Sequence, residues 1–422
     1  MNIVDDYAEL RMKAYVEAYG CTLNVGESKE TEELLARKGW EIVDDPSGSD
    51  LVVLVTCVVI ETTERAMLKR LKELSSAPRL IVTGCMASAC RERAEKIVPS
   101  AEFVPPGNPA SLAALIGELG PARQLVREKG SCSIVPIATG CKGRCAYCIT
   151  RLARGDLKSR SVETIVESVE KLSAGRPREV QITAQDTAAY GTDIGTDLPT
   201  LVHRICEIPN DFKLRIGMMN PSSALAILDP LCGMFKEPKV FKFLHLPVQS
   251  ASDRLLRDME RGYTASDFMR IVSDVRSKVP GITLSTDIIV GYPGETEEDH
   301  RANLSLIEEA LPDIVNVTRY SSRPGTKAAA SGTGVVGWKT KDRSREITET
   351  RFRVSLGKNK ELVGKRVKAL ATEHGKGSST ILRTDEYKQL VVREQLELGR
   401  YYDVEISEAT PTYLMASRRI PA

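Results

Sequence analysis

The sequence predicts an α/β protein in three parts: an N-terminal α/β domain with a parallel sheet, a central TIM-like (β/α) barrel that is complete or partial, and a small C-terminal β-barrel. Strand-like apolar runs alternate with helical stretches over roughly the first 330 residues, which is typical of parallel sheets. The last 60 or so residues hold several short strand-like runs separated by glycine and polar turns, which indicates a small barrel. With 422 residues, 42% hydrophobic and 27% charged, the chain can form two or three globular domains.

The first region, residues 11–104, has three strand-like runs with helical stretches between them. The runs are RMKAYVEAYG, LVVLVT and RLIVTG. A cysteine follows each run: Cys21, Cys57 and Cys85. Parallel strands end at one edge of a sheet, so these cysteines should converge there. A free cysteine at a strand end is ordinarily a packing residue, but three at matching positions favour a shared metal site.

A linker rich in proline, glycine and alanine is expected at residues 105–131, and a second strand–helix region at 132–330. Five strand-like runs stand out there: REVQITAQD, KLRIGMMNP, VFKFLHLPVQS, ITLSTDIIVGYPG and DIVNVTRYSS. One of the intervening helices should begin at Thr296, with Asp299 completing an arrangement close to a capping box. In a barrel of this kind, functional residues lie at the carboxyl ends of the strands.

The third region begins near residue 360, after a helix expected at 340–359. Residues 338–422 carry 18 Lys and Arg against 12 Asp and Glu, a net charge of +6 in a chain whose overall net charge is +2. A basic C-terminal segment suggests a polyanionic partner such as a nucleic acid, although a solvated charged surface gives the same composition.

The stretch GCKGRCAYC, residues 140–148, holds Cys141, Cys145 and Cys148. Cysteine thiolates hold iron–sulfur clusters, and three protein ligands on a four-iron cube leave one iron open to a substrate. Zinc is the main alternative, with a fourth ligand from Cys132 or from a distant histidine. The chain has only four histidines: His203, His245, His300 and His374.

The expected compartment follows from two features of the sequence. No apolar run is long enough for a transmembrane helix, and the N-terminus, MNIVDDYAELRMK, is too acidic and polar for a signal peptide. We therefore expect a cytoplasmic protein. In a reducing compartment, the ten cysteines are better explained by metal binding or catalysis than by disulfides.

CKGRCAYC matches the CxxxCxxC motif of radical S-adenosylmethionine enzymes, including the aromatic Tyr147 before the third cysteine. The wider sequence resembles their methylthiotransferase branch along nearly the whole chain. The matching stretches are TGCKGRCAYCITRLARGDLKSR, AYGCTLN, TCVV, TGCMA, HLPVQSAS, STDIIVGYPGETEED and YSSRPGTKAA. The resemblance implies an N-terminal methylthiotransferase domain at 11–125, a partial radical SAM barrel at 130–358, and an RNA-binding TRAM barrel at 359–420.

This resemblance implies two [4Fe–4S] clusters. The cluster on Cys141, Cys145 and Cys148 would bind S-adenosylmethionine and yield a 5′-deoxyadenosyl radical that removes hydrogen from a substrate carbon. The cluster on Cys21, Cys57 and Cys85 would carry the sulfur to be inserted, and a second S-adenosylmethionine would supply the methyl group. The protein would position the cofactors and exclude water. A low-potential electron donor of the flavodoxin or ferredoxin type and a sulfur donor are implied as partners.

Six polar residues are candidates for binding S-adenosylmethionine by analogy with this family. Four occupy strand positions and two follow the cysteine motif, where a guanidinium could neutralise a carboxylate or phosphate. An ordinary polar role at the barrel rim is an equal alternative for each of them. The six are Gln185, Arg215, Gln249, Asp287, Arg154 and Arg160. The remaining cysteines match no cluster position and are expected to be packing residues; they are Cys90, Cys132, Cys206 and Cys232.

The resemblance leaves three substrates open within the branch: threonylcarbamoyladenosine in tRNA, isopentenyladenosine in tRNA, and an aspartate of a ribosomal protein. GCTLN followed by Gly26, Glu27 and Ser28 is most similar to the archaeal and eukaryotic type, which resembles the threonylcarbamoyladenosine enzymes. The sequence therefore favours modification at adenine C2 of N6-threonylcarbamoyladenosine, at position 37 beside the anticodon. A zinc-bearing RNA-binding protein without redox chemistry is the alternative from another class.

Overall fold

The computed structural model describes residues 12–119, 132–174, 178–332 and 334–418. Backbone contacts divide the chain into two compact units. The first comprises Met1–Arg127 together with the short segment Leu152–Arg154, and the second comprises Glu128–Arg151 and Gly155–Ala422. The mixed α/β class with parallel sheets and a closed C-terminal barrel is confirmed.

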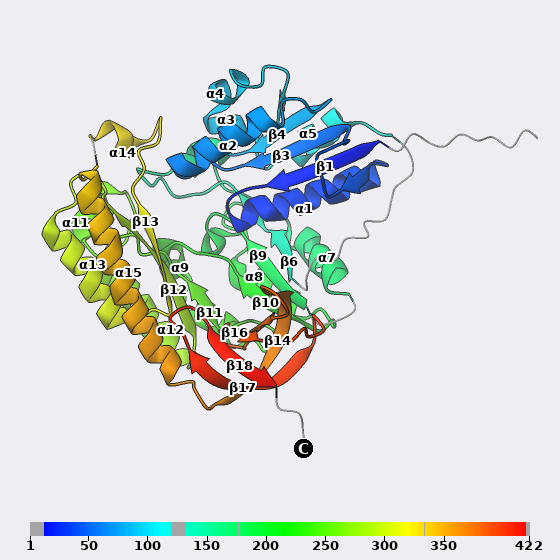
Figure 1. The fold of residues 1–422 in the computed structure, drawn as a ribbon. Coiled ribbons are helices and arrows are strands. Elements are labelled where there is room, and N and C mark those ends of the chain that lie inside the picture. The colour runs from blue at the N-terminus through cyan, green and yellow to red at the C-terminus, as the bar shows by residue number, and fades with distance from the viewer. Residues whose placement is uncertain (1–11, 120–131, 175–177, 333, 419–422) are drawn as a thin grey trace, which may run out of the picture. The chain divides into compact units, whose positions relative to one another are not determined.

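The first unit is a parallel five-stranded sheet in the order β2-β1-β3-β4-β5. Its strands are β1 Lys13–Ala18, β2 Glu41–Val43, β3 Leu51–Thr56, β4 Leu80–Gly84 and β5 Glu102–Phe103. Its helices are α1 Thr22–Arg37, α2 Glu61–Glu73, α3 Met86–Ala89, α4 Arg91–Glu95 and α5 Pro109–Ile116. Figure 1 shows α1 on one face of the sheet and α2 and α3 on the other. Covered on both faces, β3 is buried along its whole length, which explains its unbroken apolar sequence.

The expected linker at 105–131 is partly wrong, because helix α5 occupies Pro109–Ile116. The Asn108 side chain accepts a hydrogen bond from the Ser111 amide at 3.1 Å, and Pro109 stands in the first turn, where it removes no needed donor. Leu112 and Ile116 pack into the core of the first sheet. Residues 120–131 of that linker lie outside the described residues, as do the domain limits expected at 125 and 130.

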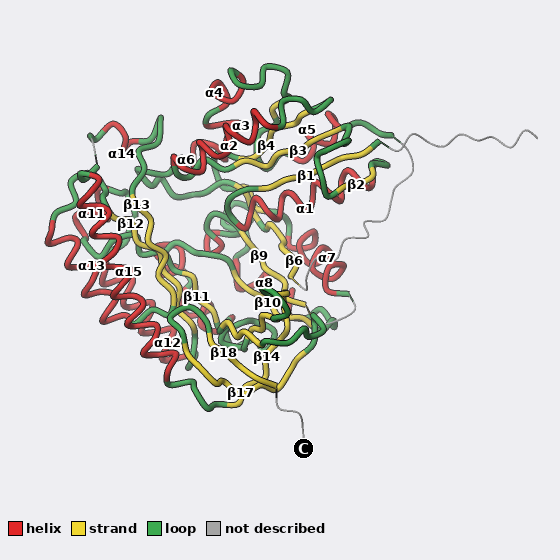
Figure 2. The backbone as a smooth tube through the Cα atoms, in the orientation of Figure 1, coloured by secondary structure: helices red, strands yellow, loops and turns green. Residues whose placement is uncertain are grey.

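The second unit contains a partial barrel of six parallel strands. They are β6 Cys132–Pro136, β9 Arg178–Thr183, β10 Phe212–Ile216, β11 Phe243–His245, β12 Thr283–Val290 and β13 Ile314–Arg319. The strands form two three-stranded sheets, β10-β9-β6 and β11-β12-β13, linked by a parallel bridge between Leu214 and Val240. Figure 2 shows these strands in a curved row with helices on the outer side. Five of them match the predicted strands, and β6 is an addition.

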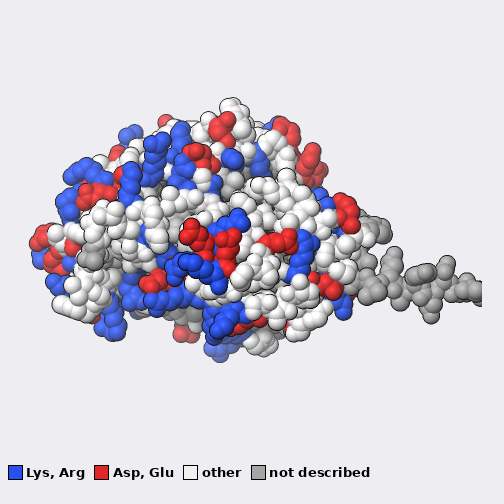
Figure 3. All heavy atoms as spheres, turned by 90° about the horizontal axis from the view of Figure 1, so that it is seen from above, with Lys and Arg blue, Asp and Glu red and all other residues white. Residues whose placement is uncertain are grey.

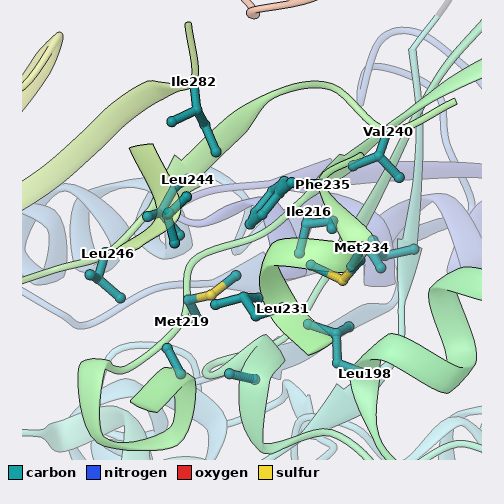
Figure 4. Close-up of a cluster of buried hydrophobic side chains, with 14 of the residues drawn as sticks. Leu198, Ile216, Met219, Leu231, Met234, Phe235, Val240, Leu244, Leu246 and Ile282 are labelled. Atoms are coloured by element: carbon teal, nitrogen blue, oxygen red, sulfur yellow. The ribbon is translucent and has the colours of Figure 1, made fainter. Parts of the chain in front are cut away.

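Helix α6, Ile149–Arg154, follows residues 140–148, and its last three residues belong to the first unit. The other helices of the second unit before residue 337 are α7 Val162–Ser173, α8 Leu198–Cys206, α9 Pro221–Ala226, α10 Leu228–Met234, α11 Asp253–Asp258, α12 Ala265–Lys278, α13 Glu297–Ala310 and α14 Lys327–Ala330, with a 3-10 turn at Thr187–Ala189. Helix α13 begins with the predicted Thr296 and Asp299, which form a full capping box. The barrel core packs Met219, Leu231 and Phe235 against Leu244 (Figure 4).

The C-terminal part begins with helix α15, Gly337–Lys360, which contains the helix expected at 340–359. A closed barrel follows in the order β14-β15-β16-β18-β17. Its strands are β14 Arg366–His374, β15 Thr380–Arg383, β16 Gln389–Val392, β17 Tyr401–Ala409 and β18 Leu414–Arg418. In the described part of the chain, no helix is both long and apolar enough to cross a membrane.

A buried carboxylate joins the C-terminal barrel to α15 and the partial barrel. Asp313 precedes β13, and its side chain lies 2.6 Å from the ammonium of Lys388 and 2.7 Å from that of Lys358. It also accepts a hydrogen bond from the Leu284 amide at 2.9 Å. Burial alone would raise the pKa of Asp313, but the two ammonium groups outweigh it and hold the pKa below its ordinary value.

Replacing Asp313 with asparagine should lower the free energy of unfolding by about 3 kcal/mol at pH 7, because Lys358 and Lys388 lose a buried counter-ion. The native pKa lies below the unfolded value, so the stabilisation is complete above about pH 4 and is lost as the pH falls further. Urea unfolding of the native protein and Asp313→Asn at pH 7 and at lower pH measures this. A stability difference that stayed constant as the pH fell would contradict the assignment.

Candidate functional site

The loop that carries Cys141, Cys145 and Cys148 follows the carboxyl end of β6. A short antiparallel ribbon frames the loop, with β7 Ala138–Thr139 paired to β8 Lys158–Ser159. The Cys141 amide donates to the Gly155 carbonyl at 3.2 Å, which closes the base of the loop. Main-chain bonds of 3.0 Å from Ala146 to Met259 and 2.8 Å from Ala328 to Ala146 attach it to the barrel.

The cysteine loop brings two of its sulfurs, those of Cys141 and Cys145, close to Gly143. The Gly143 amide donates to Cys141 Sγ at 3.3 Å, and a Cβ at Gly143 would lie 3.4 Å from Cys141 Sγ and 3.8 Å from Cys145 Sγ. Burial, with smaller contributions from Asp186 and the other two cysteines, raises the pKa of Cys141 to about 12. Burial also raises the pKa of the Cys148 thiol. Because metals bind thiolates, loading this loop must release protons.

Aromatic and apolar side chains pack behind the cysteine loop. Tyr147 meets Tyr292 edge-on with ring centroids 6.4 Å apart, and Tyr292 meets Tyr320 at 5.3 Å. Ala146, Leu255, Met259, Ile289, Tyr292 and Ala328 form one buried cluster there. This packing keeps water away from the inner side of the loop and fixes its position on the barrel.

Gln185 lies two residues beyond the carboxyl end of β9. Its Oε1 atom is buried and accepts no hydrogen bond from any described residue. The next residue, Asp186, is buried and accepts from the Asn220 amide at 2.9 Å and from Ser223 Oγ at 2.7 Å. Burial raises the pKa of Asp186 despite these bonds. Buried polar atoms are normally hydrogen-bonded, so this buried oxygen is a candidate acceptor for a donor group on a polar ligand.

In the other half of the barrel, Asp287 lies on β12 and Gln249 lies four residues beyond the end of β11. One Asp287 oxygen accepts from His245 Nε2 at 3.0 Å and from Asn316 Nδ2 at 2.7 Å. Gln249 adopts a left-handed backbone with φ of 65° and forms a parallel bridge with Ile288. Such a backbone is uncommon for residues other than glycine and often marks functional sites.

The structure places Arg215 and Arg160 in other surroundings. The Arg215 guanidinium donates to Gln181 at 2.8 Å and lies over the rings of Phe243 and Tyr387, 4.8 and 5.2 Å from their centroids. It therefore contributes to the contact between the partial barrel and the C-terminal barrel. The Arg160 main chain donates to Ile137 and accepts from the Tyr190 hydroxyl. A cofactor role for either arginine stays a prediction.

In the first unit, Cys21, Cys57 and Cys85 lie just beyond β1, β3 and β4. A Cβ added to Gly20 would lie 2.7 Å from Cys57 Sγ, so the loop after β1 closes directly over the cysteine after β3. The Cys85 amide donates to the Thr56 carbonyl at 2.9 Å. Burial raises the pKa of Cys57 and raises that of Cys85 to about 12, with the other two cysteines adding to the shift of Cys85. The predicted convergence at one sheet edge is therefore present.

Arg154 belongs to this first unit and lies among its cysteines. Its fully buried side chain donates to both Glu27 oxygens at 2.6 and 2.8 Å and to Asn24 Oδ1 at 2.8 Å. It also forms a hydrogen bond with Cys85, which partly offsets the effect of burial on the pKa of that thiol. The carboxylate that Arg154 neutralises in this structure is thus Glu27 of the same chain.

Curated relatives match this chain over nearly its full length. The probable threonylcarbamoyladenosine tRNA methylthiotransferase of Pyrococcus horikoshii is 38% identical, over 96% of this chain and 99% of the relative. The corresponding protein of Archaeoglobus fulgidus is 35% identical over 96% and 98%. The threonylcarbamoyladenosine tRNA methylthiotransferase of Xenopus laevis is 33% identical over 94% of this chain and 75% of its own. The chain belongs to this family.

Family models and solved structures agree with this membership of the methylthiotransferases. Residues 135–307 match the radical SAM superfamily, and residues 13–105 match the uncharacterized protein family UPF0004. Among solved structures, the radical S-adenosylmethionine methyltransferase TsrM of Kitasatospora setae is similar in fold. Its TM-score is 0.55 at 17% identity, covering 75% of this chain and 77% of that one.

The residues of this methylthiotransferase fit the cofactors of its family, which are S-adenosylmethionine and two [4Fe–4S] clusters. Gly143 leaves a space between the sulfurs of Cys141 and Cys145 that a side chain would partly fill. The buried side-chain oxygen of Gln185 can accept a hydrogen bond. Among the described residues, no three His, Cys, Asp or Glu side chains are placed to hold a single metal ion. The three thiols of a cluster site bind three different irons and need not meet at one point.

Sequence reasoning missed three polar residues beside the cysteines of this methylthiotransferase. Asn24 joins the Tyr19 and Thr56 carbonyls at 2.7 and 2.9 Å, and Glu27 pairs with Arg154. Arg261 donates to Cys145 Sγ at 3.0 Å across 116 residues of sequence. A contact between residues so far apart in the chain cannot be predicted from a single sequence. Asn24, which is buried, and Glu27, which is half-buried, follow Cys21 closely on α1, and this proximity could have indicated them.

Replacing Glu27 with glutamine should remove the counter-ion of the buried Arg154 guanidinium. We expect the free energy of unfolding to fall by about 3 kcal/mol, because a buried charge is left without its partner. Chemical denaturation followed by circular dichroism measures the change. Glu92→Gln, at an exposed position in the same unit, is the control and should change stability by less than about 0.5 kcal/mol. Equal losses in the two variants would contradict a buried ion pair at Glu27.

Proposed function

We propose that this chain is a tRNA methylthiotransferase that converts N6-threonylcarbamoyladenosine at position 37 to its 2-methylthio form. The observation that carries the proposal is the match of nearly the whole chain to relatives named for this activity in archaea and a vertebrate. The two cysteine triads support it, because sulfur insertion and radical formation each require a cluster. The names of these relatives favour this substrate over isopentenyladenosine and over a ribosomal-protein aspartate.

The reaction divides between two sets of residues in this proposal. Cys141, Cys145 and Cys148 hold the cluster that binds S-adenosylmethionine, with Gln185 available to accept a hydrogen bond from it. Cys21, Cys57 and Cys85 hold the auxiliary cluster. The clusters and S-adenosylmethionine supply the radical, the sulfur and the methyl group. The aromatic packing behind the cysteine loop excludes water, which protects a reactive radical from side reactions.

The C-terminal barrel, β14–β18, is the proposed RNA-binding module. Residues 338–422 carry a net charge of +6, and most of this excess lies on α15, which has eight Lys and Arg against three Asp and Glu. Contact with phosphates, which gives affinity independent of sequence, is therefore expected from α15 together with the barrel. On the face drawn in Figure 3, acidic and basic side chains are interspersed.

A tRNA substrate fits a cytoplasmic location. A low-potential electron donor of the flavodoxin or ferredoxin type and a sulfur donor complete the proposed partners.

Mass spectrometry of tRNA nucleosides tests the substrate. A deletion strain should lose 2-methylthio-N6-threonylcarbamoyladenosine and accumulate the unmethylthiolated nucleoside, and the gene returned on a plasmid should restore it. An unchanged signal in the deletion strain would refute the proposal. Loss of 2-methylthio-isopentenyladenosine instead would identify the alternative tRNA substrate.

Metal analysis of anaerobically purified protein separates the enzyme from the zinc-bearing alternative. The enzyme should be brown and contain about eight irons per chain, as two four-iron clusters require. A colourless protein with stoichiometric zinc would instead favour a non-redox RNA-binding protein.

A further inference from the structure

Arg261 is a buried cation beside the cysteine loop. It follows α11 and is 8% exposed. Its Nη1 donates to Cys145 Sγ at 3.0 Å, its Nε to the Tyr263 hydroxyl at 3.0 Å, and its Nη2 to the Pro247 carbonyl at 3.3 Å. Tyr263 is itself buried and donates to the Val248 carbonyl at 2.7 Å. The guanidinium is therefore held in a fixed place and direction by groups that cannot easily move.

The hydrogen-bond partners of this guanidinium are a thiol, a phenol and a main-chain carbonyl, and none of them is a carboxylate. Asp186 is close enough to interact with Arg261 electrostatically, but its oxygens accept hydrogen bonds from Asn220 and Ser223. Arginine stays protonated in proteins. Asp186 thus compensates Arg261 only from a distance, and among the described residues no carboxylate accepts a hydrogen bond from this guanidinium. Because a buried charge is costly unless it is closely paired, the arrangement favours a further anion beside Arg261.

Arg154, the buried arginine beside the other cysteine triad, shows the contrast. Glu27 accepts from both terminal nitrogens of Arg154 at 2.6 and 2.8 Å and neutralises it. In the described part of the chain, no carboxylate accepts a hydrogen bond from Arg261, which instead directs Nη1 at a cysteine of the radical SAM motif. A cluster held by three thiolates supplies negative charge at that position.

We propose that Arg261 is the buried counter-charge of the cluster on Cys141, Cys145 and Cys148, and that it raises the reduction potential of this cluster. A cation beside a ligand sulfur stabilises the added electron, and a hydrogen bond to that sulfur acts in the same direction. Arg261 is a positioning and tuning residue rather than a catalytic one. The inference rests on the proposed function, because it assumes that this triad holds the cluster.

Redox titration of the holoenzyme, followed by electron paramagnetic resonance, tests the proposal. The signal that changes on addition of S-adenosylmethionine identifies the relevant cluster. Arg261→Met, similar in length but uncharged, should make reduction at least tenfold less favourable, which is a shift of about 59 mV to lower potential for one electron. Arg261→Lys should keep most of the native potential, because it keeps the charge. Arg257→Met, at an exposed position four residues earlier, should not shift it.

Thermal unfolding of the cluster-free protein provides the second measurement. Removing a buried charge that no carboxylate contacts directly should leave apo Arg261→Met as stable as the apo native protein or more stable. A merely structural role would lower the stability of the apo variant and leave the potential unchanged, and that result would overturn the proposal. Equal potentials in the Met and Lys variants would also overturn it.

The two proposals fail in different ways. If the native protein shows no signal that responds to S-adenosylmethionine, the proposed function fails. If that signal is present and Arg261→Met leaves its potential unchanged, only the inference about Arg261 fails.

Discussion

Cys145→Ala should reduce cleavage of S-adenosylmethionine to background and abolish methylthiolation. Alanine removes one of the three thiolates of the cysteine loop and the sulfur to which Arg261 donates. The cluster then has too few ligands to remain bound, and we expect iron to fall by about half, from about eight to about four per chain. Chromatographic measurement of 5′-deoxyadenosine and colorimetric iron analysis provide the two results.

Cys57→Ala should separate the two roles. It should also lower iron by about half, but the loss falls on the auxiliary cluster, so cleavage of S-adenosylmethionine should continue while sulfur insertion stops. Cys206→Ala, at a cysteine outside both triads, is the control and should retain both activities. If Cys57→Ala and Cys145→Ala lost cleavage equally, the proposed division between the triads would be wrong.

Gly140→Ala should strongly reduce both stability and iron content. This glycine directly precedes Cys141, and the backbone around it leaves no space for a side chain. Its φ is 74°, in the left-handed region, and an added Cβ would lie 1.9 Å from the Asp156 carbonyl oxygen. The backbone of the loop must shift, and we expect a loss of at least about 4 kcal/mol in unfolding free energy. The three thiols would lose their arrangement with it, so the iron content should fall as it does for Cys145→Ala.

Gly155→Ala is the matched control in the same loop. Its φ of 71° is also positive, but an added Cβ meets nothing within 4 Å. Only the backbone strain remains, at a φ of 71° and a ψ of −154° that glycine adopts far more easily than other residues, and it costs about 1 to 3 kcal/mol. Denaturant unfolding and iron analysis of the two variants separate the strain from the steric clash. Equal losses of stability would show that the contact with Asp156 is relieved without cost.

Several features were predictable because local sequence encodes them. The cysteine loop follows from spacing within nine residues, and the start of α13 follows from Thr296 and Asp299. The convergence of Cys21, Cys57 and Cys85 could be predicted because parallel strands all end at one edge. The linker prediction was wrong at α5. A short stretch rich in proline, glycine and alanine favours a loop by composition, but here the packing of Leu112 and Ile116 in the core of the first sheet stabilises a helix.

By itself, the sequence determined the fold class, the two cysteine triads and the branch of enzymes that this chain resembles. These depend on residue types at short spacing and on regular strand–helix alternation. Only the tertiary structure decided the charges around the cysteines. Arg154 meets Glu27 across 127 residues and Arg261 meets Cys145 across 116. The physical reason is that a buried guanidinium is stabilised by the groups folded around it, and those groups are set by the packing of distant elements rather than by neighbours in the chain.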